Sequence, residues 1–176
     1  MGIVFDIIGS LAIRGVIVLV ILRLNLSLYE TLYLKTASAN VRKIMDEMST
    51  IIETDFHHAG YNVSGPAFVQ YDTSSVMFVG DRANTGTIDT IRLYLSGTSV
   101  YRKVNSSNAV CLSDNVAEFR LDYFNPLGET AASESEIRSI RLKMAMEESY
   151  TITLSSDGQT HHPWAKTEYQ YFPPNL

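Results

Sequence analysis

The apolar residues of this chain are concentrated at its beginning. Residues 3–22 are almost wholly apolar and are interrupted by Asp6, Ser10 and Arg14. Twenty residues at 1.5 Å per residue make a helix of about 30 Å, the thickness of the hydrocarbon layer of a membrane. A signal peptide would begin with basic residues and end at a small-residue cleavage site, whereas this chain begins Met-Gly-Ile-Val-Phe-Asp. We therefore expect the segment to be retained, either as a membrane span or as a helix that packs against copies of itself.

A helical pattern continues beyond this apolar run. Residues 23–59 contain no proline and no glycine, and Gly60 and Pro66 then provide a stop. Apolar residues recur every three or four positions, as in one stripe of an amphipathic helix, at Leu24, Leu28, Leu32, Val41, Ile44, Met48, Ile51, Ile52, Phe56 and Ala59. The pattern predicts one helix of roughly 85 Å from Ile3 to Ala59, apolar on every side in its first half and on one side in its second.

After Gly60 the apolar period changes from that of a helix to that of β-strands. Apolar and polar residues alternate in three segments, with the apolar positions at Ile91, Leu93 and Leu95, at Ala117, Phe119, Leu121 and Tyr123, and at Ile140, Leu142, Met144 and Met146. The Ser96-Gly97-Thr98 sequence predicts a hairpin turn between residues 88–95 and 100–104. We therefore expect an α+β fold, in which an antiparallel β-sheet head packs on the second half of the long helix.

The second and third of these segments carry opposite charges on their polar faces. If residues 116–124 pair with residues 137–146, the polar face of the first presents Glu118 and Asp122. These carboxylates would then lie across from Arg141 and Lys143. Such cross-strand pairs contribute about 0.2–1 kcal/mol each.

Charge and cysteine content exclude several classes of function. The 176 residues include 14 Lys and Arg against 19 Asp and Glu, a net charge of −5. This is the wrong sign for a protein that binds the phosphate backbone, so we expect no nucleic acid partner. The single cysteine, Cys111, excludes an intramolecular disulfide and a zinc site of the CxxC type. Its apolar neighbours Val110 and Leu112 predict that it is a buried small side chain.

Nothing in the sequence favours catalysis. The four histidines form two adjacent pairs, His57-His58 and His161-His162. Adjacent helical residues point about 100° apart, so neither pair can hold a metal by itself, although the two pairs could meet across the fold. The sequence has no GxSxG, HExxH or glycine-rich phosphate loop. We expect no enzyme activity, no metal and no cofactor.

The charges inside the apolar segment are the more informative signal. A charge at bilayer depth costs about 2.5–3.5 kcal/mol and usually has a partner. Asp6 and Arg14 are eight residues apart, about 12 Å along a helix, which is too far for pairing within one chain. Between helices staggered by about two turns they would lie level, and repetition of that step builds an open filament. The alternative is that Asp6 lies near the membrane interface and Arg14 extends its side chain toward water.

Several short motifs, in this order along the chain, resemble the type IV pilin and type II pseudopilin class. The segment from Glu53 to Tyr61 is similar to the acidic-x-x-x-Ala-Gly-Tyr helix end of the minor-pilin and J-type pseudopilin branch. Residues 91–95 followed by Val100-Tyr101-Arg102 are similar to its paired strands with an L-x-R element. Residues 115–124 with Gly128, and then residues 137–142, resemble its next two strands, so the resemblance covers most of the chain.

The resemblance implies a role for the first charged residue and also shows departures. In this class an acidic residue near the mature N-terminus neutralises the terminal amine of a neighbouring subunit, and Asp6 is the matching position. The acid of the class stands fifth after a glycine that ends a basic leader, whereas Asp6 is fourth after Gly2 and no basic leader precedes it. Arg14 is not a usual feature of the class, so pairing of Asp6 with Arg14 is a competing hypothesis. Many pilins close a C-terminal loop with a disulfide, which one cysteine forbids here.

Together these observations predict a structural subunit of a type IV pilus-like extracellular filament. Residues 1–34 would form the membrane and filament-core helix, residues 35–60 its amphipathic half, and residues 61–176 a β-rich globular head. The chain would reside in the inner membrane before assembly and then pack against identical subunits, with other pilin-like proteins and an assembly platform as further partners. The side chains expected to pack in the filament core are Ile3, Phe5, Ile7, Ile8, Leu11, Ile13, Val16, Leu19 and Leu22.

Two alternatives stay open at the level of sequence. One is a minor pseudopilin that primes or tips a type II secretion-like assembly. The other is a single-span anchored β-domain that binds a ligand in the cell envelope. Residues 125–136 and 159–164 are expected to be surface loops, and the second contains candidates for a surface contact, Trp164, His161 and His162.

Overall fold

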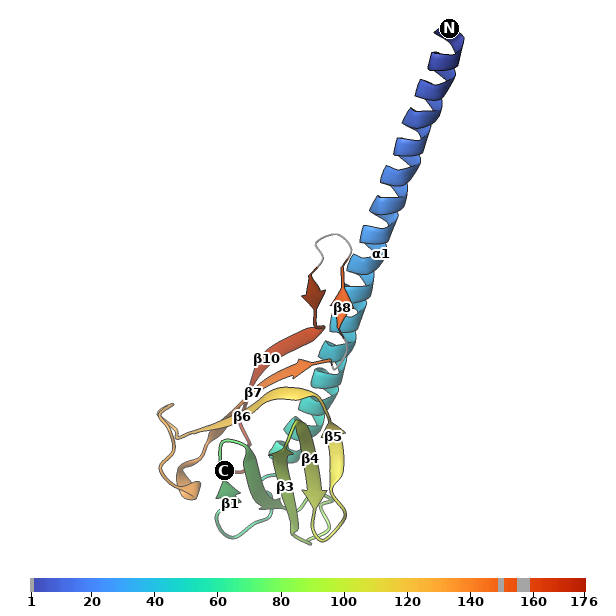
Figure 1. Ribbon diagram of the computed structural model, residues 1–176. Coiled ribbons are helices and arrows are strands. Elements are labelled where there is room, and N and C mark those ends of the chain that lie inside the picture. Colours follow the sequence, from blue (N-terminus) through green and yellow to red (C-terminus); the bar gives the residue numbers. More distant parts are fainter. Residues whose placement is uncertain (1, 149–150, 155–158) are drawn as a thin grey trace.

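The protein consists of one long helix with a β-rich head at its C-terminal end (Figure 1). The computed structural model describes residues 2–148, 151–154 and 159–176. Helix α1 spans Gly2–His57, 56 residues without a break, close to the predicted bounds. The head contains antiparallel sheets, and the last strand of one of them, β10 (Trp164–Tyr171), lies along α1. The predicted α+β fold is therefore confirmed.

The two halves of α1 have different surroundings. From Asp6 to Leu26 every residue is exposed, and the first buried residue is Ala37. Beyond it, one stripe spaced by three or four residues is buried against the head, as the amphipathic pattern predicts; its apolar members are Ala37, Val41, Met45, Met48, Ile52, Phe56 and Ala59. The prediction was wrong for Ile44 and Ile51, which are 39% and 42% exposed at the flank of this stripe.

A five-stranded sheet packs at the C-terminal end of α1 (Figure 1). Its strands lie in chain order, and each pairs antiparallel with the next: β1 (Phe68–Tyr71), β2 (Ser75–Gly80), β3 (Asp89–Ser96), β4 (Ser99–Val104) and β5 (Val110–Ser113). The predicted hairpin between β3 and β4 is confirmed, with Ser96 opposite Ser99. Gly97 has φ +61°, a conformation that a two-residue hairpin turn requires at its first position.

A three-stranded sheet joins the head to the side of α1. Its order is β10-β7-β6, where β7 is Ser139–Glu147 and β6 is Val116–Phe124. The predicted pairing of β6 with β7 is confirmed, and their apolar faces supply much of the core. A short 3-10 helix (Glu134–Glu136) lies in the connection between them.

The cross-strand charge pairs are confirmed only in part. Lys143 lies 3.2 Å from Asp122, as predicted. Glu118 instead pairs with Lys166 at 2.7 Å, and Arg141 pairs with Glu168 at 3.1 Å. Both new partners belong to β10, a strand that the sequence pattern did not reveal.

Two register shifts move predicted core residues to the surface. A bulge in β6 between Val116 and Glu118 turns Val116 inward and leaves Ala117 exposed. A second shift, where β4 pairs with the edge strand β5, buries Ser113 and exposes Cys111. The expectation that Cys111 is buried was therefore wrong. One inserted residue reverses the faces of a strand because its side chains alternate with period two.

Part of the expected surface loop at residues 159–164 is strand. Thr160–His161 forms β9, which pairs with β8 (Ile152–Thr153), and Trp164 begins β10. The prediction of an irregular loop at residues 159–164 was therefore wrong in part. The strands β8 and β9 are short and mostly polar, so their alternation of apolar and polar residues is weak.

Candidate functional site

The exposed half of α1 is the most unusual surface of the molecule. The predicted packing residues Ile7, Ile8, Leu11, Ile13, Val16, Leu19 and Leu22 are each 53–66% exposed. Ile3 and Phe5 belong to the same helix, but their side chains lie outside the described residues. A fully buried side chain of this kind gains about 1.5–3 kcal/mol over an exposed one. This surface therefore has a strong tendency to be covered by lipid or protein.

By length and composition this part of α1 can cross a membrane. Its most apolar stretch of 18 residues has a mean hydropathy of 2.3, and none of that stretch is buried within the molecule. Two polar side chains of this half bond to the helix itself: the Asn25 amide donates to the Ile21 carbonyl at 3.0 Å, and the Thr31 hydroxyl donates to the Ser27 carbonyl at 2.8 Å. Satisfied donors of this kind are what an apolar environment requires.

Asp6 and Arg14 do not satisfy each other within this chain. Both are exposed, and the helix between them is continuous, so they are about 12 Å apart along the axis. Among the described residues neither takes part in an ion pair. Both charges are therefore open to a partner from another molecule or to the membrane surface.

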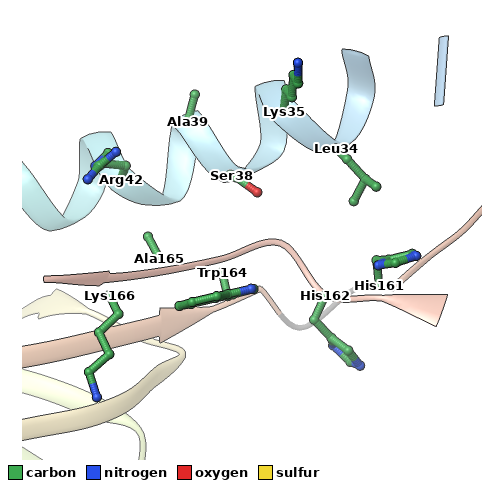
Figure 2. Close-up of a pocket in the computed structure, with 10 residues that line it drawn as sticks. All are labelled: Leu34, Lys35, Ser38, Ala39, Arg42, His161, His162, Trp164, Ala165 and Lys166. Carbon is green, nitrogen blue, oxygen red and sulfur yellow. The ribbon is translucent and has the colours of Figure 1, made fainter. Parts of the chain in front are cut away.

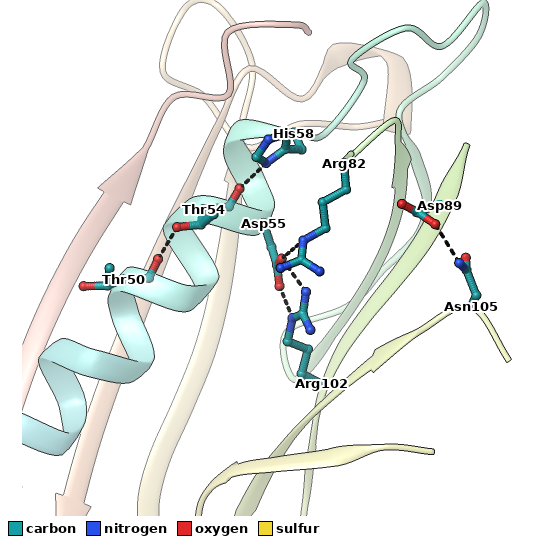
Figure 3. Close-up of polar contacts among 8 residues, drawn as sticks. All are labelled: Thr50, Thr54, Asp55, His58, Arg82, Asp89, Arg102 and Asn105. Atoms are coloured by element: carbon teal, nitrogen blue, oxygen red, sulfur yellow. Dashed lines mark hydrogen bonds and ion pairs between the residues drawn. The ribbon is translucent and has the colours of Figure 1, made fainter. Parts of the chain in front are cut away.

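At its other end α1 is fixed to the head by a buried ion pair (Figure 3). The carboxylate of Asp55 is 1% exposed and accepts two hydrogen bonds from Arg102, at 2.5 Å from Nε and 2.8 Å from Nη2. The Nε of Arg82, whose side chain is 44% exposed, lies 3.7 Å from the same carboxylate. A carboxylate in the last turn of a helix faces the negative end of the helix dipole, so it needs such cationic partners. The hydrogen bond to Asp55 also raises the pKa of Arg102.

This ion pair connects two of the segments that carry the resemblance to pilins. Asp55 is the acidic residue of the helix-end motif, and Arg102 is the arginine of the L-x-R strand β4. Sequence reasoning did not predict their contact, because 47 residues separate them and no local pattern couples them.

Two glycines allow close packing where α1 ends within the head. Gly60 has φ +77° and donates its amide proton to the Val79 carbonyl at 2.9 Å. A Cβ on Gly80 would overlap the carbonyl oxygen of His58, so only glycine fits between β2 and the helix end. The Asn175 amide, in the C-terminal tail, donates to the His57 carbonyl at 3.1 Å.

Strand β10 holds the middle of the amphipathic half through tyrosines. The hydroxyl groups of Tyr171 and Ser49 are 2.7 Å apart in a buried contact, and the Tyr171 ring packs on Phe56 with centroids 5.4 Å apart. The Tyr169 hydroxyl donates to Asp46 Oδ1 at 2.6 Å. Burial raises the pKa of Tyr171 to about 12. A weak alternation in residues 164–171 is the signal that could have identified this strand.

The predicted surface-contact residues lie beside α1, near the boundary between its two halves. Trp164, His161 and His162 line a groove of about 590 Å³ between β9, β10 and α1 (Figure 2). The two histidine pairs do not meet, because His57 and His58 lie at the end of α1, roughly 25 Å along the helix from this groove. Among the described residues no group of three or more His, Cys, Asp or Glu could hold a metal ion.

The chain thus has a pilin-like architecture: a long, exposed apolar helix whose second half packs on C-terminal antiparallel sheets. No protein-family model matches the chain, and no curated protein matches it significantly in sequence.

Proposed function

We propose that this protein is a structural subunit of a type IV pilus-like extracellular filament, which polymerises through the exposed half of α1. The observation that carries the proposal is the contrast within one unbroken helix. Its first half exposes apolar side chains on every side, while one stripe of its second half is buried in the head. A helix of this kind is suited to leave a membrane and enter a bundle of identical helices.

The mechanism follows from the apolar surface and its two charges. Transfer from lipid to a helix bundle keeps the side chains out of water, so packing between helices and neutralisation of charge provide the driving force. A stagger of about 12 Å places Asp6 of one subunit level with Arg14 of the next. Each pairing leaves the next Asp6 and Arg14 free to pair again, which gives an open array.

Shearing of producing cells, followed by electron microscopy and mass spectrometry of the sheared fraction, tests the proposal. We expect filaments made mainly of this chain. Asp6→Ala and Arg14→Ala should each abolish them, and the reversed pair Asp6→Arg with Arg14→Asp should restore them. Arg23→Ala, which removes another exposed charge of the same helix, is the matched control and should leave filaments intact.

Each other outcome has a defined meaning. If only Asp6→Ala abolishes filaments, Asp6 pairs with a neighbour's terminal amine rather than with Arg14. Normal filaments from the double alanine variant would eliminate both pairing schemes. Absence of this chain from sheared filaments, with the protein left in the inner membrane, would contradict the role of major subunit.

A second candidate is a minor subunit that primes or tips such an assembly. The resemblance to the minor-pilin and J-type branch favours it, and the contact of Asp55 with Arg102, which unites two of the motifs, gives them one structural role. A minor subunit would be recovered in small complexes with other pilin-like proteins. A single-span anchored β-domain would stay monomeric in detergent, which separates the three possibilities.

A further inference from the structure

Three kinds of surface follow one another along α1 just before the head. Arg23 ends the apolar run of residues 3–22, and two exposed aromatic residues follow, Tyr29 and Tyr33, which are 71% and 58% exposed and have Glu30 between them. Lys35 and Arg42 come next. Trp164, at the start of β10, is 61% exposed and lies beside this part of the helix. An order of apolar, aromatic and cationic side chains is typical of the boundary between a membrane and water.

The groove beside this part of α1 concentrates positive charge in a chain whose net charge is −5. Its lining includes three cationic residues and two histidines but no carboxylate. Lys166 is already paired with Glu118, and His162 lies 3.3 Å from Glu147. Among the described residues, Lys35 and Arg42 take part in no ion pair. These two cations are therefore available to an external anion.

The directions of the side chains indicate a flat partner rather than a small ligand. Figure 2 shows Ser38 on the side of α1 that faces β10 and Lys35 on the opposite side. Lys166 points away from the helix. The three cations thus point in different directions and do not converge on one point in the groove. An anionic surface that α1 crosses can attract Lys35 and Arg42 without such convergence, which a single bound anion requires.

We propose that Tyr29, Tyr33, Lys35, Arg42 and Trp164 form an interfacial collar that docks the unassembled subunit on anionic lipid headgroups. Counted from Leu28, the apolar residue that directly precedes the collar, Lys35 lies about 10 Å and Arg42 about 21 Å along the helix. Lys35 can therefore reach a headgroup layer of about 5–8 Å, and the side chain of Arg42 comes within about one Debye length of the outer edge of that layer. The collar would set how deeply α1 enters the bilayer and hold the head against its surface. The proposal rests on the membrane stage of the proposed function and does not require polymerisation.

The test uses Trp164 as a native probe, because it is the only tryptophan of the chain. The full-length protein is reconstituted into vesicles of phosphatidylcholine, with or without about 30% phosphatidylglycerol. Quenching of tryptophan emission by headgroup spin-labelled lipid is measured. We expect stronger quenching and a blue-shifted emission in the anionic vesicles, both lost at about 0.5 M salt because screening weakens attraction to the surface.

Two matched variants assign the effect to the collar. Lys35→Gln with Arg42→Gln should lower the ratio of docked to undocked protein roughly thirtyfold, or about fivefold per charge. Arg92→Gln with Lys103→Gln removes the same charge from β3 and β4 and should leave the quenching unchanged. Circular dichroism should show the same folded head in both variants.

Three outcomes would overturn the proposal. The first is equal quenching in neutral and anionic vesicles. The second is an equal loss of quenching in the two double variants, which would mean that binding depends on the net charge of the protein and not on the collar. The third is a change in Trp164 emission on adding duplex DNA to neutral vesicles, abolished by Lys35→Gln with Arg42→Gln, which would identify the partner as nucleic acid. The vesicle test and the filament test are independent, so one can fail while the other succeeds.

Discussion

The two halves of α1 share one backbone and differ in almost everything that surrounds it. In the first half, Leu11 and Leu19 are 62% and 66% exposed, although both are as apolar as any residue of the core. In the second half, Met48 and Ile52 are 1% and 0% exposed. The head therefore stabilises only the part of the helix that it covers. From Asp6 to Leu26, no residue of the first half is covered by the described part of the chain.

This difference separates folding from assembly. Substitutions in the second half, or at the head residues that contact it, should change the stability of the head, and the same substitutions in the first half should not. Substitutions in the first half should instead impair filament assembly, because only this half supplies the apolar surface on which neighbouring subunits pack. Four pairs of identical substitutions test this separation. In each, urea unfolding of the head is followed by circular dichroism, with the protein in mild detergent.

The largest effect on the free energy of unfolding is expected for substitution of arginine by alanine. Arg102→Ala leaves the buried Asp55 carboxylate with only the more distant Arg82, and loss of one partner of a buried ion pair costs about 3–5 kcal/mol. Arg23→Ala, in the exposed half, should not change the free energy of unfolding. An Arg102→Ala protein as stable as the wild type would show that the head does not depend on this contact.

The second-largest effect on the free energy of unfolding is expected for substitution of isoleucine by alanine. Ile52 is fully buried between α1 and the sheets, so Ile52→Ala should lower the free energy of unfolding by about 2–5 kcal/mol. Ile17 is 52% exposed, and Ile17→Ala should leave the head unchanged while weakening packing in a filament. Equal losses from the two variants would mean that the first half of α1 also folds against the head.

Sequence patterns predicted the elements whose signal is local. The length of α1, the strands β3, β6 and β7 and the turn at Gly97 all follow from periodicity and turn chemistry, and the structure confirms them. The short strands at the edges and β10 carry a weak alternation, so they were missed or interpreted as loop.

The errors arise where a single inserted residue or a distant partner decides the outcome. Ala117 and Cys111 follow the expected pattern, but bulges reverse the faces of their strands. The pairing of Asp55 with Arg102 depends on how the end of α1 meets β4, which no local pattern contains. Whether Asp6 meets Arg14 depends on a second copy, so it stays a prediction.

Substitution of glycine by alanine should have smaller effects on stability, with opposite signs at Gly80 in the head and Gly15 in the first half of α1. A Cβ at Gly80 would overlap the backbone of His58, and overpacking of this kind costs about 1–3 kcal/mol. Gly15 has open space around it, and Gly15→Ala should favour the helix by about 0.5–1 kcal/mol. The helical signal of the first half should then persist to a higher temperature. A Gly80→Ala head that keeps wild-type stability would show that the helix end can move away from β2.

The smallest effect concerns a single hydroxyl group. Tyr171→Phe removes the contact with Ser49 and should cost about 0.5–1.5 kcal/mol at neutral pH, whereas Tyr29→Phe in the exposed half should cost nothing. The Tyr171→Phe variant should also differ from the wild type in alkaline solution. Tyrosine in the unfolded chain ionises near pH 10, while burial raises the pKa of Tyr171 to about 12.

Between these two values the unfolded chain has released a proton that the folded chain retains, so the free energy of unfolding falls as pH rises. The contribution of Tyr171 is fully present below pH 10 and is lost as the pH passes 12. Tyr171→Phe should make this decline shallower by one proton. Equal alkaline slopes in wild type and Tyr171→Phe would mean that the hydroxyl of Tyr171 is accessible to water, and that β10 covers α1 less tightly than its contact with Ser49 requires.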